Sequence, residues 1–105
     1  MGFFSKIFGL GTDTEKIREY LANGATIIDV RTKDEYRSGH IRKSENIPLQ
    51  NMSNRIGKIK GKNKKVIACC RSGARSGSAV TLLKRHGIDA VNGGSWNNLE
   101  SIIKG

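Results

Sequence analysis

The chain has 105 residues, of which 36% are hydrophobic and 27% charged, and this length and balance fit one globular domain and argue against a second domain or a largely disordered chain. Nineteen lysines and arginines against nine aspartates and glutamates give a net charge of +10, which attracts anionic ligands and acidic partners. The lysines are dispersed, the dense run 58–65 lacks interleaved aromatic residues, and no helix-turn-helix or zinc spacing is present, so nucleic-acid binding is disfavoured.

The chain opens with an apolar segment at residues 1–11. The segment is too short to span a membrane and has no signal-peptide pattern. We expect it to pack on the domain, with weak association with a membrane surface or a partner as the alternative. We assign residues 12–105 to a single domain and expect no membrane span and a monomer.

Helical and strand patterns alternate along the first half of the chain. Two capping-box sequences, 12–15 and 32–35, each open a predicted helix, and Gly24 and Gly39 close these helices. In chain order we expect a helix at about 13–23, a strand at 25–30, a short helix at 32–39, an extended piece at 46–49 and a loosely helical stretch from Leu49 to Ile59.

The second half continues the alternation. We expect a strand at 66–69, a loop at 70–76, a helix from about Ser76 to His86, a strand at 88–92, a turn at Gly93-Gly94 and a helix at 96–103. Apolar strands that alternate with helices predict an α/β fold with a parallel sheet. Ligands of such sheets bind beyond the carboxyl ends of the strands. Cys70, Asp29 and Arg31 all fall there.

The loop Cys70-Arg71-Ser72-Gly73-Ala74-Arg75-Ser76 follows an apolar strand and leads into a helix. Successive backbone amides and a helix N-terminus around a thiol favour negative charge, and therefore the thiolate. A free cysteine is only about 3% ionised at pH 7, so this stabilisation decides whether the thiol is reactive. The alternative is a glycine-containing turn with a buried, inert cysteine, and the two loop arginines argue against it.

The cysteines and histidines also bear on compartment and metal binding. Cys69 and Cys70 are adjacent and cannot form an ordinary disulfide without severe strain, so we expect a reducing compartment, the cytoplasm. No Cys-x-x-Cys or His-x-x-x-His spacing occurs. We expect no metal and no cofactor.

Several motifs occur together in a recognisable order. They are Asp29-Val30-Arg31, Glu35-Tyr36, Gly39-His40-Ile41, Asn46-Ile47-Pro48, the loop 70–76 and Gly93-Gly94-Ser95-Trp96. Over about residues 12–103 the chain resembles a single rhodanese domain. The resemblance implies a three-layer α/β sandwich in which helices flank a central, mostly parallel sheet of four to five strands.

The resemblance also implies a sulfurtransferase in which Cys70 carries sulfane sulfur as a persulfide. The implied donor is thiosulfate, a polysulfide or a protein persulfide, and the acceptor is a thiol or cyanide. The substrate-binding loop would consist of Arg71, Ser72, Gly73, Ala74, Arg75 and Ser76. The backbone amides of residues 71–75 would surround the sulfur. Both arginines would face the anionic donor, and both serine hydroxyls would add hydrogen bonds.

Two other activities stay open for the same fold. A non-catalytic binding or sulfur-carrier module is the main alternative. A phosphatase-like activity is disfavoured because Cys70 and Arg75 enclose four residues, whereas the related phosphatases have five.

Other candidate residues have structural interpretations that we favour. Asp29 is expected to accept hydrogen bonds from nearby backbone or from Arg31, with a supporting role at the site. His40 is expected to be a packing residue rather than a base, because a thiolate stabilised by amides needs no histidine. Trp96 is expected to anchor the core. Cys69 should face away from Cys70 by strand alternation and stay buried and inert rather than act as a resolving thiol.

Overall fold

A computed structural model describes residues 13–105, so the segment 1–11 lies outside the described residues. Its centre is a four-stranded sheet in the order β2-β1-β3-β4, and every neighbouring pair is parallel. The strands are β1 (Thr26–Asp29), β2 (Glu45–Asn46), β3 (Val66–Cys70) and β4 (Ala90–Ser95). Parallel pairing brings the carboxyl ends of β1 and β3 together, and Asp29 pairs with Cys69.

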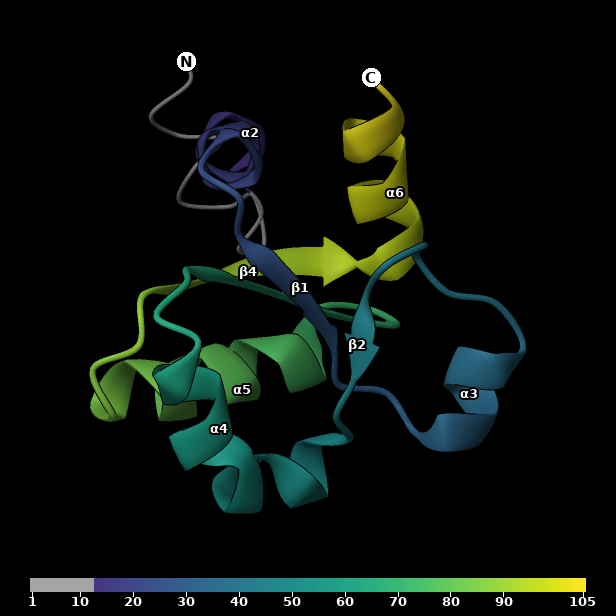
Figure 1. Ribbon diagram of the computed structural model, residues 1–105. Helices are drawn as coiled ribbons and strands as arrows, with labels where there is room; N and C mark the ends of the chain where they lie inside the picture. The colour runs from purple at the N-terminus through teal and green to yellow at the C-terminus, as the bar shows by residue number, and fades with distance from the viewer. Residues whose placement is uncertain (1–12) are drawn as a thin grey trace.

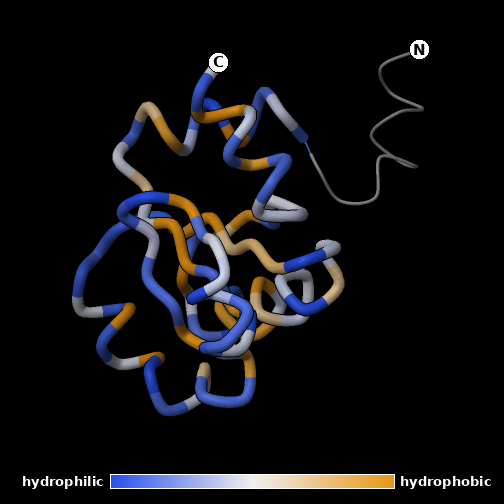
Figure 2. Tube along the Cα trace, turned by 90° about the vertical axis from the view of Figure 1, so that its right-hand side faces the viewer, coloured by the Kyte–Doolittle hydropathy of each residue, from blue (hydrophilic) through white to orange (hydrophobic). Residues whose placement is uncertain are grey.

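Helices cover both faces of the sheet, which gives the three layers expected from the sequence (Figure 1). One face packs against α2 (Thr14–Ala22) and α6 (Trp96–Lys104). The other packs against η1 (Leu49–Arg55), α4 (Ile56–Gly61) and α5 (Ala74–Arg85). The short helix α3 (Lys33–Arg37) lies to the side of the sheet, between β1 and β2 in the chain. In Figure 2 the hydrophobic stretches lie mainly inside, and the outer turns are hydrophilic.

The helix starts follow local side-chain chemistry. The predicted capping box at 32–35 is confirmed, because the Glu35 amide donates to Thr32 Oγ1 at 3.2 Å and the Thr32 amide donates to Glu35 Oε1 at 3.0 Å. The box predicted at 12–15 is wrong in register. Asp13 is the N-cap of α2, and its carboxylate accepts from the Lys16 amide at 3.3 Å.

Two further boundaries differ from the sequence-based expectation. The loose helical stretch after Pro48 divides into a 3₁₀ segment, η1, and the α-helix α4. Helix α5 begins at Ala74, two residues before the predicted start. The loop that follows β3 is therefore short, and the first turn of α5 lies close to the end of the strand.

The predicted turn at Gly93-Gly94 is wrong, because both glycines belong to β4. Pairing with β3 passes from Ala68 opposite Asn92 to Cys70 opposite Ser95, so β4 holds one extra residue, a β-bulge. Gly94 has φ +79°, and a Cβ added to Gly93 would lie 2.9 Å from the side chain of Ile67. The glycines therefore serve the bulge and a close approach of backbone to core.

Candidate active site

Cys70 ends β3 and points its sulfur into the turn that leads to α5. Its Sγ accepts hydrogen bonds from the Gly73 amide at 3.0 Å and the Ser76 amide at 3.3 Å. Gly73 has φ +101°, a left-handed conformation that favours glycine, and this conformation turns the chain back over the sulfur. The Cys70 residue is fully buried, at 0% exposure. A cradle of amides was expected from residues 71–75, but the Ser76 amide, outside that range, also donates.

Ionisation of Cys70 reflects two opposing influences. Burial alone would raise the pKa of the thiol, but hydrogen bonds from the Ser76 hydroxyl and from the amides of Ser76, Gly73 and Ser72 outweigh burial and lower the pKa. Ser76 Oγ lies 3.3 Å from Cys70 Sγ and 2.7 Å from Asn92 Oδ1. Because a hydroxyl carries one proton, Ser76 can donate either to Asn92 or to the Cys70 thiolate.

Asn92 is a site residue that the sequence motifs do not indicate. Its amide nitrogen donates to the Gly73 carbonyl at 3.0 Å, and its Oδ1 accepts from the Gly94 amide at 2.9 Å as well as from Ser76. The side chain thus joins β4 to the turn around Cys70. The available signal was an amide between the apolar strand residues Ala90-Val91 and the glycine pair.

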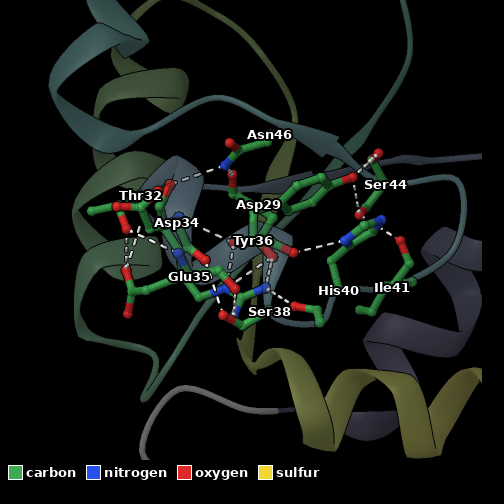
Figure 3. Close-up of polar contacts among 12 residues, drawn as sticks. Asp29, Thr32, Asp34, Glu35, Tyr36, Ser38, His40, Ile41, Ser44 and Asn46 are labelled. Carbon is green, nitrogen blue, oxygen red and sulfur yellow. Dashed lines mark hydrogen bonds and ion pairs between the residues drawn. The ribbon is translucent and has the colours of Figure 1, made fainter.

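Asp29 and Arg31 form a buried ion pair beside the site. Arg31 Nη2 lies 2.6 Å from Asp29 Oδ2, and Arg31 Nε donates to both carboxylate oxygens at 2.9 and 3.0 Å. Arg31 also donates to the Gly39 carbonyl at 2.7 Å, and its guanidinium lies over the Trp96 ring, 4.7 Å from the centroid. Asp29 therefore accepts hydrogen bonds from Arg31, as expected. Figure 3 shows Asp29, the last residue of β1, near Asn46 and the residues of α3.

Arg75 is engaged by an acidic side chain rather than free to face a ligand. Its Nη1 and Nη2 donate to Glu35 Oε1 at 2.7 Å and Oε2 at 3.0 Å, a bidentate pair. The hydrogen bond from Arg75 is the main cause that lowers the pKa of Glu35 to about 2. The sequence predicts that Arg75 faces an anionic donor, whereas in the structure the Glu35 carboxylate competes for its guanidinium.

Arg71 and His40 lie on the exposed side of the site. Arg71 lines a hollow of about 230 Å³ together with Glu35, Trp96 and other residues. His40 is exposed. Its ring stacks on Tyr36 with centroids 3.8 Å apart, and its Nδ1 lies 2.8 Å from the Tyr36 carbonyl oxygen (Figure 3). These contacts agree with a packing role for His40.

Cys69 lies in the hydrophobic cluster on the opposite side of the sheet from the cluster that contains Cys70. The alternation predicted from the strand is therefore confirmed. Burial, followed by the nearby Asp29 charge, raises the pKa of the Cys69 thiol far above its ordinary value. Within residues 13–105, histidine, cysteine, aspartate and glutamate form no group of three that could hold a metal ion. No helix of this part of the chain is long and apolar enough to cross a membrane.

Cys70 thus lies in a turn at the carboxyl end of a parallel strand, and the Asn92 side chain ties this turn to the neighbouring strand β4. Residues 13–99 match the rhodanese-like domain family, and the chain belongs to that family.

Individual relatives agree with this assignment. The chain is 38% identical over 67 residues to the uncharacterised protein YqhL of Bacillus subtilis, a match to 64% of this chain and 52% of YqhL. It is 35% identical over 65 residues to the thiosulfate sulfurtransferase PspE of Escherichia coli, a match to 61% of this chain and 62% of PspE. The chain thus spans less than two thirds of either relative.

A solved structure supports the fold. A rhodanese with anions from E. coli has a TM-score of 0.64 and 32% identity, and the match covers 70% of this chain and 89% of that chain.

Proposed function

We propose that this protein is a sulfurtransferase that carries sulfane sulfur as a persulfide on Cys70. The observation that carries the proposal is the environment of Cys70 Sγ, which accepts hydrogen bonds from the Gly73 and Ser76 amides. The lowered pKa of the thiol increases the fraction of the nucleophilic thiolate. Homology to a thiosulfate sulfurtransferase supports the same reaction class.

The first step loads the cysteine. The Cys70 thiolate attacks the outer sulfur of thiosulfate, the new Cys70 S–S bond forms, and the sulfur–sulfur bond of thiosulfate breaks with its electron pair leaving on sulfite. The persulfide anion that forms occupies the region where the amides stabilise negative charge. Because Cys70 is fully buried, the loop residues 71–75 must move away from its sulfur before the donor sulfur can reach it.

The second step regenerates the enzyme. An acceptor thiolate or cyanide attacks the outer sulfur of the persulfide, and the Cys70 thiolate departs with the electron pair of the broken S–S bond. The same hydrogen bonds that favour the thiolate as a nucleophile also favour it as a leaving group. One stabilising environment therefore serves both steps.

The test is the intact mass of the protein after incubation with thiosulfate, or in parallel with polysulfide, and gel filtration. We expect wild type to gain about 32 Da, the mass of one sulfur atom, and to lose it on treatment with cyanide. Cys70→Ala should gain nothing, and Cys69→Ala, the matched control, should gain as wild type does. A gain that persists in Cys70→Ala, or no gain in wild type with either donor, would contradict the proposal and favour a non-catalytic binding module.

A further inference from the structure

The ion pair between Arg75 and Glu35 joins the active-site turn to a helix that is distant in the sequence. Arg75 lies in the first turn of α5 and Glu35 in α3, and two hydrogen bonds of 2.7 and 3.0 Å connect them. The side chains are 36% and 28% exposed, so the pair lies at the surface of the site. A bidentate carboxylate uses the same donors that a guanidinium offers to an anionic ligand.

Glu35 is held in position independently of Arg75. Its Oε1 also accepts from the Thr32 amide at 3.0 Å and lies 3.2 Å from Thr32 Oγ1, as Figure 3 shows. Its own carbonyl accepts from Arg31 Nη1 at 3.2 Å. The carboxylate is thus fixed beside the turn, and with a pKa of about 2 it is ionised throughout the neutral range.

The two partners of the pair line different hollows. Arg75 lines a hollow of about 310 Å³ whose wall includes Val30, Pro48 and Leu49. Glu35 lines the hollow of about 230 Å³ that also contains Arg71. Among residues 13–105 the ion pairs do not include Arg71. The turn therefore presents one guanidinium without a carboxylate and one that is neutralised.

We infer that Glu35 determines the charge selectivity of the Cys70 site, by neutralising Arg75 and so disfavouring doubly charged donors such as thiosulfate relative to a persulfide carried on a thiol. This inference rests on the proposed function for the identity of the donors. The effect of Glu35 on the electrostatic potential at Cys70 does not depend on the identity of the donors, because any reagent that reaches Cys70 meets the same charges. Removing one negative charge beside the site should raise the local positive potential, and this strengthens attraction of anions most when they carry more charge.

The experiment compares two alkylating reagents that differ in charge, iodoacetate and iodoacetamide, and quantifies modified Cys70 by peptide mass. Both react with the same thiolate, so the ratio of their rate constants cancels any change in thiolate fraction. For Glu35→Gln we expect the iodoacetate-to-iodoacetamide ratio to rise about threefold or more. Glutamine can still accept from the Thr32 amide, which preserves the capping box.

Glu45→Gln is the matched control, because Glu45 also pairs with a cation, Lys62 at 3.2 Å, but lies in β2 and outside the turn. It should keep the wild-type ratio. The double variant Glu35→Gln/Arg75→Gln should also return to that ratio, because it removes both charges. If Glu35→Gln does not fold, Arg75→Gln tests the same inference with opposite sign, since the unpaired Glu35 should lower the ratio.

The donors are then compared directly, with thiosulfate and cysteine persulfide loading Cys70 of wild type and Glu35→Gln. We expect the substitution Glu35→Gln to increase the rate of Cys70 loading more with thiosulfate than with cysteine persulfide, each relative to wild type. An unchanged alkylation ratio in a folded Glu35→Gln, with normal sulfur loading, would overturn the proposed role of Glu35 and leave the sulfurtransferase proposal intact. A raised ratio in a protein that neither donor loads would support the electrostatic role and overturn the sulfurtransferase assignment.

Discussion

Ser76 contributes two separable groups to the Cys70 sulfur, a backbone amide and a hydroxyl. The amide lies 3.3 Å from Sγ and the hydroxyl oxygen also lies 3.3 Å away. Replacing the residue with alanine removes the hydroxyl and keeps the amide. The contribution of the hydroxyl can therefore be measured alone.

We expect Ser76→Ala to raise the pKa of Cys70. Loss of a donor to the thiolate disfavours the charged form, so the midpoint of the alkylation rate against pH should move to higher pH. Iodoacetamide is the suitable reagent because it is uncharged. Ser78→Ala, an exposed position on the same helix, should leave the midpoint in place. An unshifted midpoint in Ser76→Ala would mean that the hydroxyl remains bound to Asn92 when Cys70 ionises.

At the scale of secondary structure, the bulge in β4 follows directly after Asn92, and the Gly94 amide within it donates to Asn92 Oδ1. The bulge includes Gly93, whose added Cβ would meet Ile67, Leu99 and the Ala68 carbonyl at 2.9, 3.1 and 3.2 Å. A backbone carbonyl and two core side chains cannot all move aside at low cost. This position therefore couples core packing to the geometry of the site.

We expect Gly93→Ala to lower the free energy of unfolding by about 1–3 kcal/mol, as overpacking of a core does. Gly57→Ala in α4 is the matched control, since nothing lies within 4 Å of its added Cβ. That substitution should stabilise the protein by about 0.5–1 kcal/mol through helix propensity. Urea denaturation measures both values. Equal effects of the two substitutions would show that the close approach at Gly93 relaxes freely.

The sequence allowed the elements and the cysteine turn to be predicted because their signals are local. Capping residues, apolar β-branched strands and the order strand, cysteine loop, helix all lie within a few neighbouring positions. The pair of Glu35 with Arg75 and the contacts of Asn92 join residues 40 and 16–19 positions apart. No local pattern specifies such partners. Gly93-Gly94 was predicted as a turn because a bulge and a turn require the same backbone freedom.

At the scale of the whole molecule, the net charge of +10 acts differently from the local pair of Arg75 and Glu35. It attracts anions from a distance, and salt screens it. Because the Debye length falls from about 30 Å at 0.01 M to about 8 Å at 0.15 M, we expect the rate of Cys70 alkylation by iodoacetate to fall over this range. The rate with iodoacetamide should hold constant. A parallel fall of both rates would point instead to an effect of salt on the loop or the thiolate.

The side chains of two adjacent cysteines lie on opposite faces of the sheet. The Cys70 thiol lies under a short turn, and the Cys69 thiol faces the layer formed by α2 and α6. We expect a reagent to reach Cys70 when the turn around its sulfur moves, and to reach Cys69 only when α2 and α6 separate from the sheet. The chain thus carries its own reporter of global opening. Under native conditions, the slow appearance of a second alkyl group gives the free energy of that opening without denaturant, while the first group, on Cys70, reports the motion of the turn in the same sample.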